Sequence, residues 1–72
     1  MTVELSAQEK IAIIDQHLKS IEYSLYNNEL DLIEANASTP VDASVVSNIE
    51  SKISATTGKK NALLAAKADL EA

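Results

Sequence analysis

Apolar residues recur along the first half of the chain at alternating intervals of three and four positions. Between residues 11 and 35 they form one row, in which Asn28 fills the single polar place: Ile11, Ile14, Leu18, Ile21, Leu25, Leu32 and Ala35. Such a row lies along one side of an α-helix and follows the heptad pattern of helices that pack against each other. We call it the seam. Since neither Gly nor Pro occurs before Pro40, the pattern predicts one uninterrupted helix over about residues 7–36.

The residues at the two ends of this segment fit helix boundaries. Ser6 and Glu9 have the spacing of a capping box, in which the hydroxyl of the first and the carboxylate of the second each accept a hydrogen bond from the other's backbone N–H. At the far end the sequence predicts a turn over residues 37–39. Thr39 is then the expected N-cap of a second helix and Pro40 its first residue. This second helix is expected to run from about residue 40 to residue 70.

The second helical segment has a less regular pattern. Residues of one heptad position recur every seven places, with further apolar residues beside them: Ile49, Thr56, Leu63 and Leu70, flanked by Val45, Val46, Ile53, Leu64 and Ala66. Gly58 interrupts the segment and costs about 1 kcal/mol relative to Ala inside a helix. A break there would give three helices. We expect a continuous helix, because the heptad phase persists and because a new helix start would place Lys59 and Lys60 in a first turn, where the helix dipole disfavours them.

Together these segments predict an all-α fold, an antiparallel two-helix hairpin that resembles a coiled coil. A turn centred near Ser38 places residue i opposite about residue 76 − i, so that Leu32 meets Val45. The same register brings Asn28 to Asn48 or Ile49, and a hydrogen bond between Asn28 and Asn48 would offset the cost of burying a lone amide. The pattern leaves open whether the helices pair within one chain or between chains.

Composition indicates that the hairpin needs further packing. Val, Ile and Leu together number 19 of 72 residues, which is above the roughly 20% level typical of disordered chains. The chain has no Trp, Phe or Cys, so it lacks the aromatic residues and disulfides that usually support small cores. A lone hairpin buries only one side of each helix. We therefore expect it to be part of a larger helical bundle or assembly, with itself or other protein subunits as partners.

The charge distribution argues against several other partners. The net charge is −5 and there is no Arg, whereas nucleic-acid binding requires a basic face. No apolar run approaches the roughly 20 residues of a membrane span. The N-terminal residues lack the basic and apolar regions of a signal peptide. The expectation is a chain that binds neither nucleic acid nor membrane and that is located in the cytoplasm or within a virus particle.

No group of residues suggests chemistry. His17 is the only histidine, and no carboxylate lies three or four residues from it, as metal sites in helical bundles require. The helical carboxylates, such as Asp31 and Glu34, are at spacings that usually form a solvated face. The Thr57-Gly-Lys-Lys segment lacks the second glycine and the hydroxyl residue of a phosphate-binding loop. We expect no enzyme activity, no cofactor, no metal and no small-molecule substrate.

A second apolar row is the feature most relevant to function. It lies about 150° around the first helix from the seam and consists of Tyr23, Tyr26, Leu30, Ile33 and Ala37. We call it the tyrosine stripe. Contiguous exposed apolar residues commonly mark protein interfaces, in which Tyr is enriched. The alternative interpretation is that the second helix covers part of the stripe, or that these are scattered surface residues.

Two functional hypotheses follow. In the first, the chain is a non-enzymatic structural or assembly protein that acts through helix–helix contacts, as a homo-oligomer or within a larger particle such as a phage virion. In the second, it is a small acidic regulator or adaptor that docks on a basic groove of another protein through the face formed by Tyr23, Tyr26, Leu30 and Ile33. The first predicts a discrete oligomer and the second predicts salt-sensitive binding.

Overall fold

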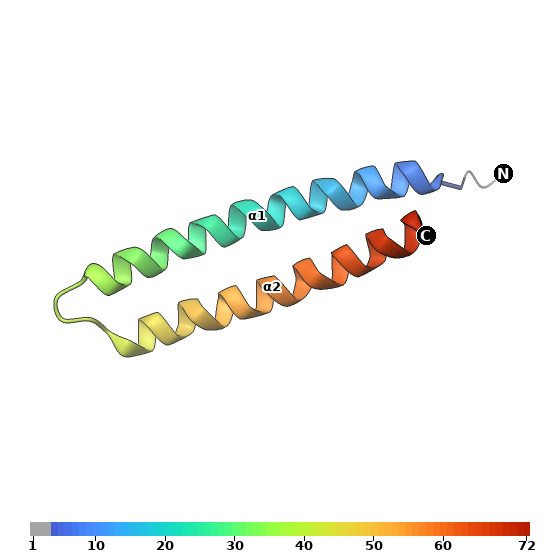
Figure 1. Cartoon of the computed structure of the whole chain (residues 1–72). Helices are drawn as coiled ribbons and strands as arrows, with labels where there is room; N and C mark the ends of the chain where they lie inside the picture. The colour runs from blue at the N-terminus through green and yellow to red at the C-terminus, as the bar shows by residue number, and fades with distance from the viewer. Residues whose placement is uncertain (1–3) are drawn as a thin grey trace.

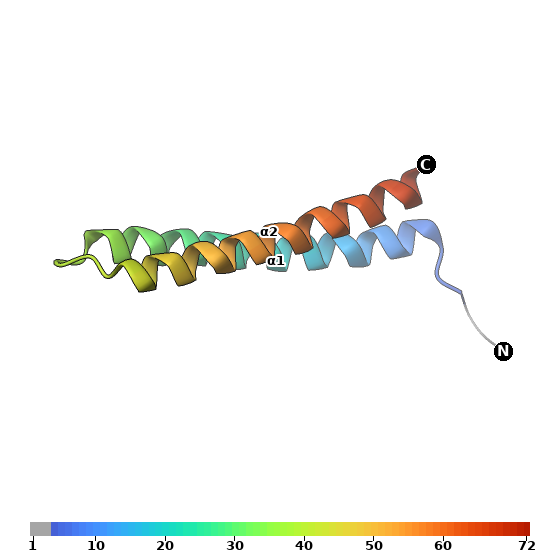
Figure 2. The ribbon, with the colours of Figure 1, turned by 90° about the horizontal axis from the view of Figure 1, so that it is seen from below.

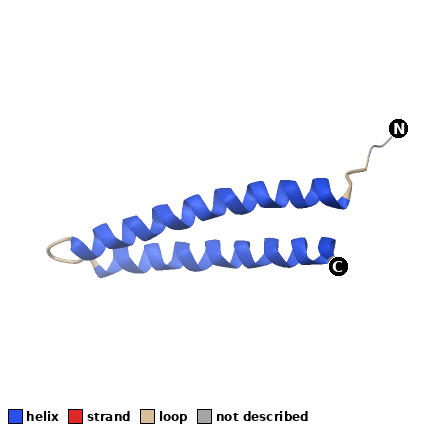
Figure 3. Ribbon diagram, turned by 45° about the horizontal axis from the view of Figure 1, so that its top comes forward, coloured by secondary structure: helices blue, strands red, loops and turns tan. Residues whose placement is uncertain are grey.

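The computed structural model describes residues 4–72 and shows two long helices folded back on each other (Figure 1). Helix α1 spans Ala7–Ala37 and helix α2 spans Ala43–Glu71. The described part of the chain contains only helix and loop (Figure 3). The structure measures 60 × 20 × 15 Å. It confirms the prediction of an all-α antiparallel hairpin, although residues 1–3 of the predicted 1–72 unit lie outside the described residues.

Helix α1 begins with the predicted capping box. The Ser6 hydroxyl accepts a hydrogen bond from the Glu9 N–H at 3.1 Å, and the Glu9 carboxylate accepts one from the Ser6 N–H at 3.2 Å. At the other end the Ser38 N–H donates to the Ala35 carbonyl and the Ser38 hydroxyl donates to the Glu34 carbonyl. These bonds satisfy backbone groups that the helix itself leaves without partners.

Helix α2 begins three residues later than the sequence predicted. Its N-cap is Asp42, not Thr39, and Pro40 belongs to the turn instead of the first helical position. The Asp42 carboxylate accepts hydrogen bonds from the Ser44 hydroxyl at 2.8 Å, the Ser44 N–H at 3.0 Å and the Val45 N–H at 3.4 Å. Because a carboxylate also carries charge that suits the positive end of the helix, it is a stronger cap than the threonine hydroxyl.

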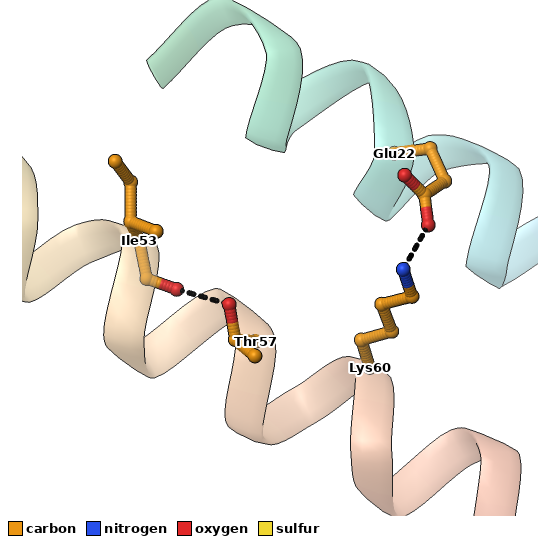
Figure 4. Close-up of polar contacts among 4 residues, drawn as sticks. All are labelled: Glu22, Ile53, Thr57 and Lys60. Carbon is orange, nitrogen blue, oxygen red and sulfur yellow. Dashed lines mark hydrogen bonds and ion pairs between the residues drawn. The ribbon is translucent and has the colours of Figure 1, made fainter. Parts of the chain in front are cut away.

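Helix α2 passes through Gly58 without a break, which confirms the prediction of a continuous helix. Just before the glycine, the Thr57 hydroxyl donates a hydrogen bond of 2.7 Å to the Ile53 carbonyl (Figure 4). A Cβ atom built on Gly58 would meet no other atom within 4 Å. Nothing within the hairpin therefore requires a glycine at this position.

The seam lies between the helices as predicted. All eight of its α1 positions are half-buried, and every other described residue of α1 is exposed. The half-buried residues of α2 follow the same alternation of three and four: Val46, Ile49, Ile53, Thr56, Lys60, Leu63, Lys67 and Leu70. The two helices stay alongside each other and cross at a small angle (Figure 2). No side chain of residues 4–72 is fully buried.

The register of the two helices differs from the predicted one. Because the turn extends over residues 38–42, its centre is Pro40 and not Ser38. Asn28 is half-buried in the seam, but Asn48 is exposed, and no hydrogen bond joins the two amides among the side-chain bonds of residues 4–72. The predicted Asn28–Asn48 pair is therefore wrong. The longer turn moves the facing residues along α2.

Candidate protein-interaction surface

The tyrosine stripe lies on the side of α1 that faces away from α2. Tyr23 is 65% exposed, Tyr26 61% and Ile33 64%, while Leu30 is 38% exposed. Ala37 at the end of the helix is also exposed. These values show that α2 leaves Tyr23, Tyr26 and Ile33 uncovered, since a covered side chain would keep little of its surface. The sequence reasoning thus placed the stripe correctly in space, and its role as an interface stays a prediction.

A shallow hollow lies on this outer surface of α1. It is lined by Lys19, Glu22, Tyr23 and Tyr26, which are spaced as one side of two helical turns. The two tyrosine rings form its apolar part. Glu22 also contacts Lys60 across the helix pair, so the edge of the hollow is fixed by α2.

Beyond Lys19 at its N-terminal end, the charges around the stripe are all negative. No lysine occurs between residues 20 and 51. Glu29, Asp31 and Glu34 are exposed beside the stripe, and none of them makes an ion pair within residues 4–72. We call these three residues the acidic flank. An apolar row between unneutralised carboxylates suits a partner that brings cations.

Two lysines of α2 occupy seam positions that the sequence reasoning did not assign to them. The side chains of Lys60 and Lys67 are only 33% and 28% exposed. Their ammonium groups reach across to Glu22 and to Asp15, the latter at 2.9 Å from Lys67 (Figure 4 shows the Lys60 pair). The hydrogen bond with Asp15, and then its negative charge, raises the pKa of Lys67. The seven-residue spacing from Val46 and Ile53 could have revealed both lysines, because a lysine stem covers apolar surface while its head remains in water.

His17 is exposed on α1. Within residues 4–72 no three His, Asp or Glu side chains converge in a way that could hold a metal ion. Neither helix in the described part of the chain has an apolar stretch long enough to cross a membrane.

No protein-family model, curated protein or solved structure matches this chain. Function is therefore inferred from the hairpin's own surface. That surface offers one continuous apolar row, the tyrosine stripe, beside the acidic flank.

Proposed function

We propose that this chain is a non-enzymatic structural or assembly protein that acts through helix–helix contacts with further protein subunits. The observation that supports this most strongly is the absence of any fully buried side chain among residues 4–72, combined with the exposed tyrosine stripe. A chain that encloses no core gains most from burying surface against another molecule.

The dimensions of the hairpin support the same view. Its radius of gyration is 16.9 Å, whereas a compact domain of this length has a radius of about 11 Å. Its accessible surface is 5492 Å², about a quarter more than the roughly 4,300 Å² typical of a compact monomer of its mass. An elongated molecule with excess surface resembles a component of a helical bundle more closely than a self-contained domain.

The tyrosine stripe is the proposed contact. Aromatic residues near the centre of an interface commonly supply much of its binding free energy. Tyr23 and Tyr26 would be such anchors, and Leu30 and Ile33 would continue the contact for two further helical turns. The proposal extends to a component of a larger particle, such as a phage virion, in which a small helical chain without a catalytic group could serve as a repeated packing unit.

Sedimentation equilibrium over a range of micromolar concentrations tests the proposal. The wild-type chain should form a discrete oligomer. Tyr26→Ala combined with Leu30→Ala should shift it to lower mass, because both substitutions remove exposed apolar surface from the centre of the stripe. The matched control is Ile13→Ala combined with Val41→Ala, which removes side chains of similar exposure outside the stripe. Equal association of both variants would show that the stripe is not the contact.

A second candidate function is that of a small acidic regulator or adaptor. The acidic flank favours it, since Glu29, Asp31 and Glu34 would pair with a basic groove on a different protein. In this case the purified chain stays monomeric and captures a basic protein from its source. Capture should weaken as ionic strength rises, and it should be lost in the Tyr26→Ala, Leu30→Ala variant. A stable oligomer of the chain alone would favour assembly over this alternative.

A further inference from the structure

We infer that the occupant of the tyrosine stripe is the outer face of α2 in a second copy of this chain. The inference rests on the proposed assembly function and names its partner surface. It makes the contact heterologous, with two different faces of the hairpin meeting. Each copy would then offer its α1 to one neighbour and its α2 to another.

Like charges oppose the simpler arrangement, in which two stripes face each other. Glu22, Glu29, Asp31 and Glu34 all lie in the part of α1 that carries the stripe, and no lysine lies between residues 20 and 51. Since Glu22 is paired with Lys60, a symmetric pairing of α1 with α1 would gather six carboxylates that are unpaired within residues 4–72 around one apolar row, with Lys19 as the nearest lysine of each α1. Like charges brought together across an interface are unfavourable and suppress such pairings.

Helix α2 is less acidic than α1 and has one basic edge, although its charges that are unpaired within residues 4–72 are Lys52 and Lys59 against Glu50, Asp69 and Glu71. Helix α1 holds six acids and two lysines, a net charge of −4, whereas α2 holds three acids and four lysines, a net charge of +1. Two of the α2 lysines, Lys60 and Lys67, already pair within the hairpin. The other two, Lys52 and Lys59, are exposed and make no ion pair among the described residues. They lie one above the other, seven residues apart, along one edge of the outer face of α2.

The Lys52–Lys59 edge of α2 would meet acids beside the tyrosine stripe of a neighbouring copy, whether the two helices run parallel or antiparallel. Viewed along α1, Glu29 lies on one side of the stripe, whereas Asp31 and Glu34 lie on the other. Reversing the direction of the second helix exchanges the side of the stripe that its lysines approach. Lys52 and Lys59 would therefore face carboxylates in both a parallel and an antiparallel contact, while Glu50 lies on the opposite edge of α2.

The shape of α2 supports the pairing independently. Opposite its seam residues, α2 presents small or short side chains between residues 47 and 65, among them Ser51, Ser54, Ala55, Ala62 and Ala65, and Asp69 follows on the same side. Gly58 lies at the centre of this face, and the space beside it is open to 4 Å. A glycine inside a helix lowers stability relative to alanine and nothing within the hairpin requires it. A close approach by the bulky tyrosine stripe of a neighbour would use that space.

Because the two faces differ, such contacts form a ring if the rotation between copies closes and a filament if it does not. The test is a charge exchange between two variants. The acidic variant carries Lys52→Glu and Lys59→Glu, and the basic variant carries Glu29→Lys and Glu34→Lys. All four residues are exposed, so both variants should keep the helical circular dichroism of the wild type.

Each variant alone brings like charges together at every contact, and its dissociation constant in sedimentation velocity should rise by about tenfold or more. In an equimolar mixture each face meets its complement, so association should return with the two variants alternating. Native mass spectrometry of the mixture should then show mixed species only. As a matched control for net charge, Lys10→Glu should associate like the wild type, whereas Lys59→Glu alone should be weakened.

Three results would overturn the inference. Undiminished association of the acidic variant would show that α2 is not the partner surface. Failure of the mixture to recover would show that the two faces do not meet each other. A wild-type chain that stays monomeric would exclude a second copy as occupant. That last result would also count against assembly, and it would favour the adaptor function if the Tyr26→Ala, Leu30→Ala variant loses a basic protein that the wild type captures. Association that persists in the acidic variant but is lost in the Tyr26→Ala, Leu30→Ala variant would refute the inference alone and leave assembly through the stripe intact.

Discussion

Replacing Lys60 with leucine should stabilise the hairpin, although it removes one of the two ion pairs between the helices. Lys60 occupies a seam position with its side chain 33% exposed, and its partner Glu22 is 55% exposed. Ion pairs this accessible to water contribute about 0.2–1 kcal/mol. Fixing a lysine side chain costs roughly 1 kcal/mol more conformational entropy than fixing a leucine, and the leucine leaves no ammonium to keep hydrated.

A leucine at this position also restores the aliphatic row of α2 between Ile53 and Leu63. Full burial of a leucine side chain contributes about 1.5–3 kcal/mol, but the methylene groups of Lys60 already supply much of that burial. Adding the gain in entropy and subtracting the lost ion pair leaves a net stabilisation of about 0.5–1 kcal/mol. For a chain of this size it would raise the melting temperature by about 2–8 °C.

The assay is urea unfolding followed by circular dichroism of the helices. It is carried out at a concentration where sedimentation shows a single copy, because self-association would add stability of its own. Lys60→Gln is the matched control: it removes the charge without adding an aliphatic side chain, and it should lower the stability by about 0.5 kcal/mol. If Lys60→Leu destabilises the hairpin as much as Lys60→Gln does, the ion pair outweighs apolar packing and the reasoning is wrong.

Four further predictions concern the capping box, the glycine and the pH dependence of two charged residues. Ser6→Ala should lower the free energy of unfolding by about 1 kcal/mol, because it removes the acceptor for the Glu9 N–H; Ser20→Ala, at an exposed position inside α1, should leave the urea midpoint almost unchanged. Gly58→Ala should raise the stability of the single copy by up to about 1 kcal/mol, while Gly58→Leu should weaken self-association in sedimentation velocity; unchanged association would contradict a close approach at this position. Hydrogen bonds from the Ser44 hydroxyl and then from backbone N–H groups lower the pKa of Asp42 below 3.8. The contribution of Asp42 to stability should therefore be complete above pH 3.8 and disappear as the pH falls through the pKa of the folded state. At that low pH, wild type and Asp42→Ala should have the same melting temperature. The pKa of Lys67 is raised, so its pH dependence is the reverse. The contribution of Lys67 to stability is complete below pH 10.5 and is lost as the pH rises through the pKa of the folded state, where wild type and Lys67→Gln should have the same stability.

Helix α1 could be predicted from its sequence almost residue by residue. Its capping box, its length and all eight seam positions were confirmed, since the apolar row from Ile11 to Ala35 is regular and no competing signal interrupts it. The exposure of the tyrosine stripe followed from the same periodicity. In a two-helix molecule only one side of each helix can be covered, so a second apolar row has to face outward.

Helix α2 was predicted less well, and each error has a physical cause. Residue types that favour a helix start occur at Thr39, Pro40 and Asp42. Only the hydrogen bonds in the structure show that the N-cap is Asp42. The register depends on the length of the turn, so an error there displaced the predicted Asn28–Asn48 pair. Lys60 and Lys67 were not recognised as seam residues, because a search for apolar residues leaves out lysine, although its methylene groups can pack against apolar surface.

The placement of the aromatic residues has a practical consequence. Tyr23 and Tyr26 are the only tyrosines, and the chain has neither Trp nor Phe. The intrinsic ultraviolet fluorescence of the molecule therefore originates entirely from one side of α1. Any event that dehydrates this side should change the tyrosine emission, and no label is needed to detect it. Rearrangements elsewhere in the hairpin should change that emission little.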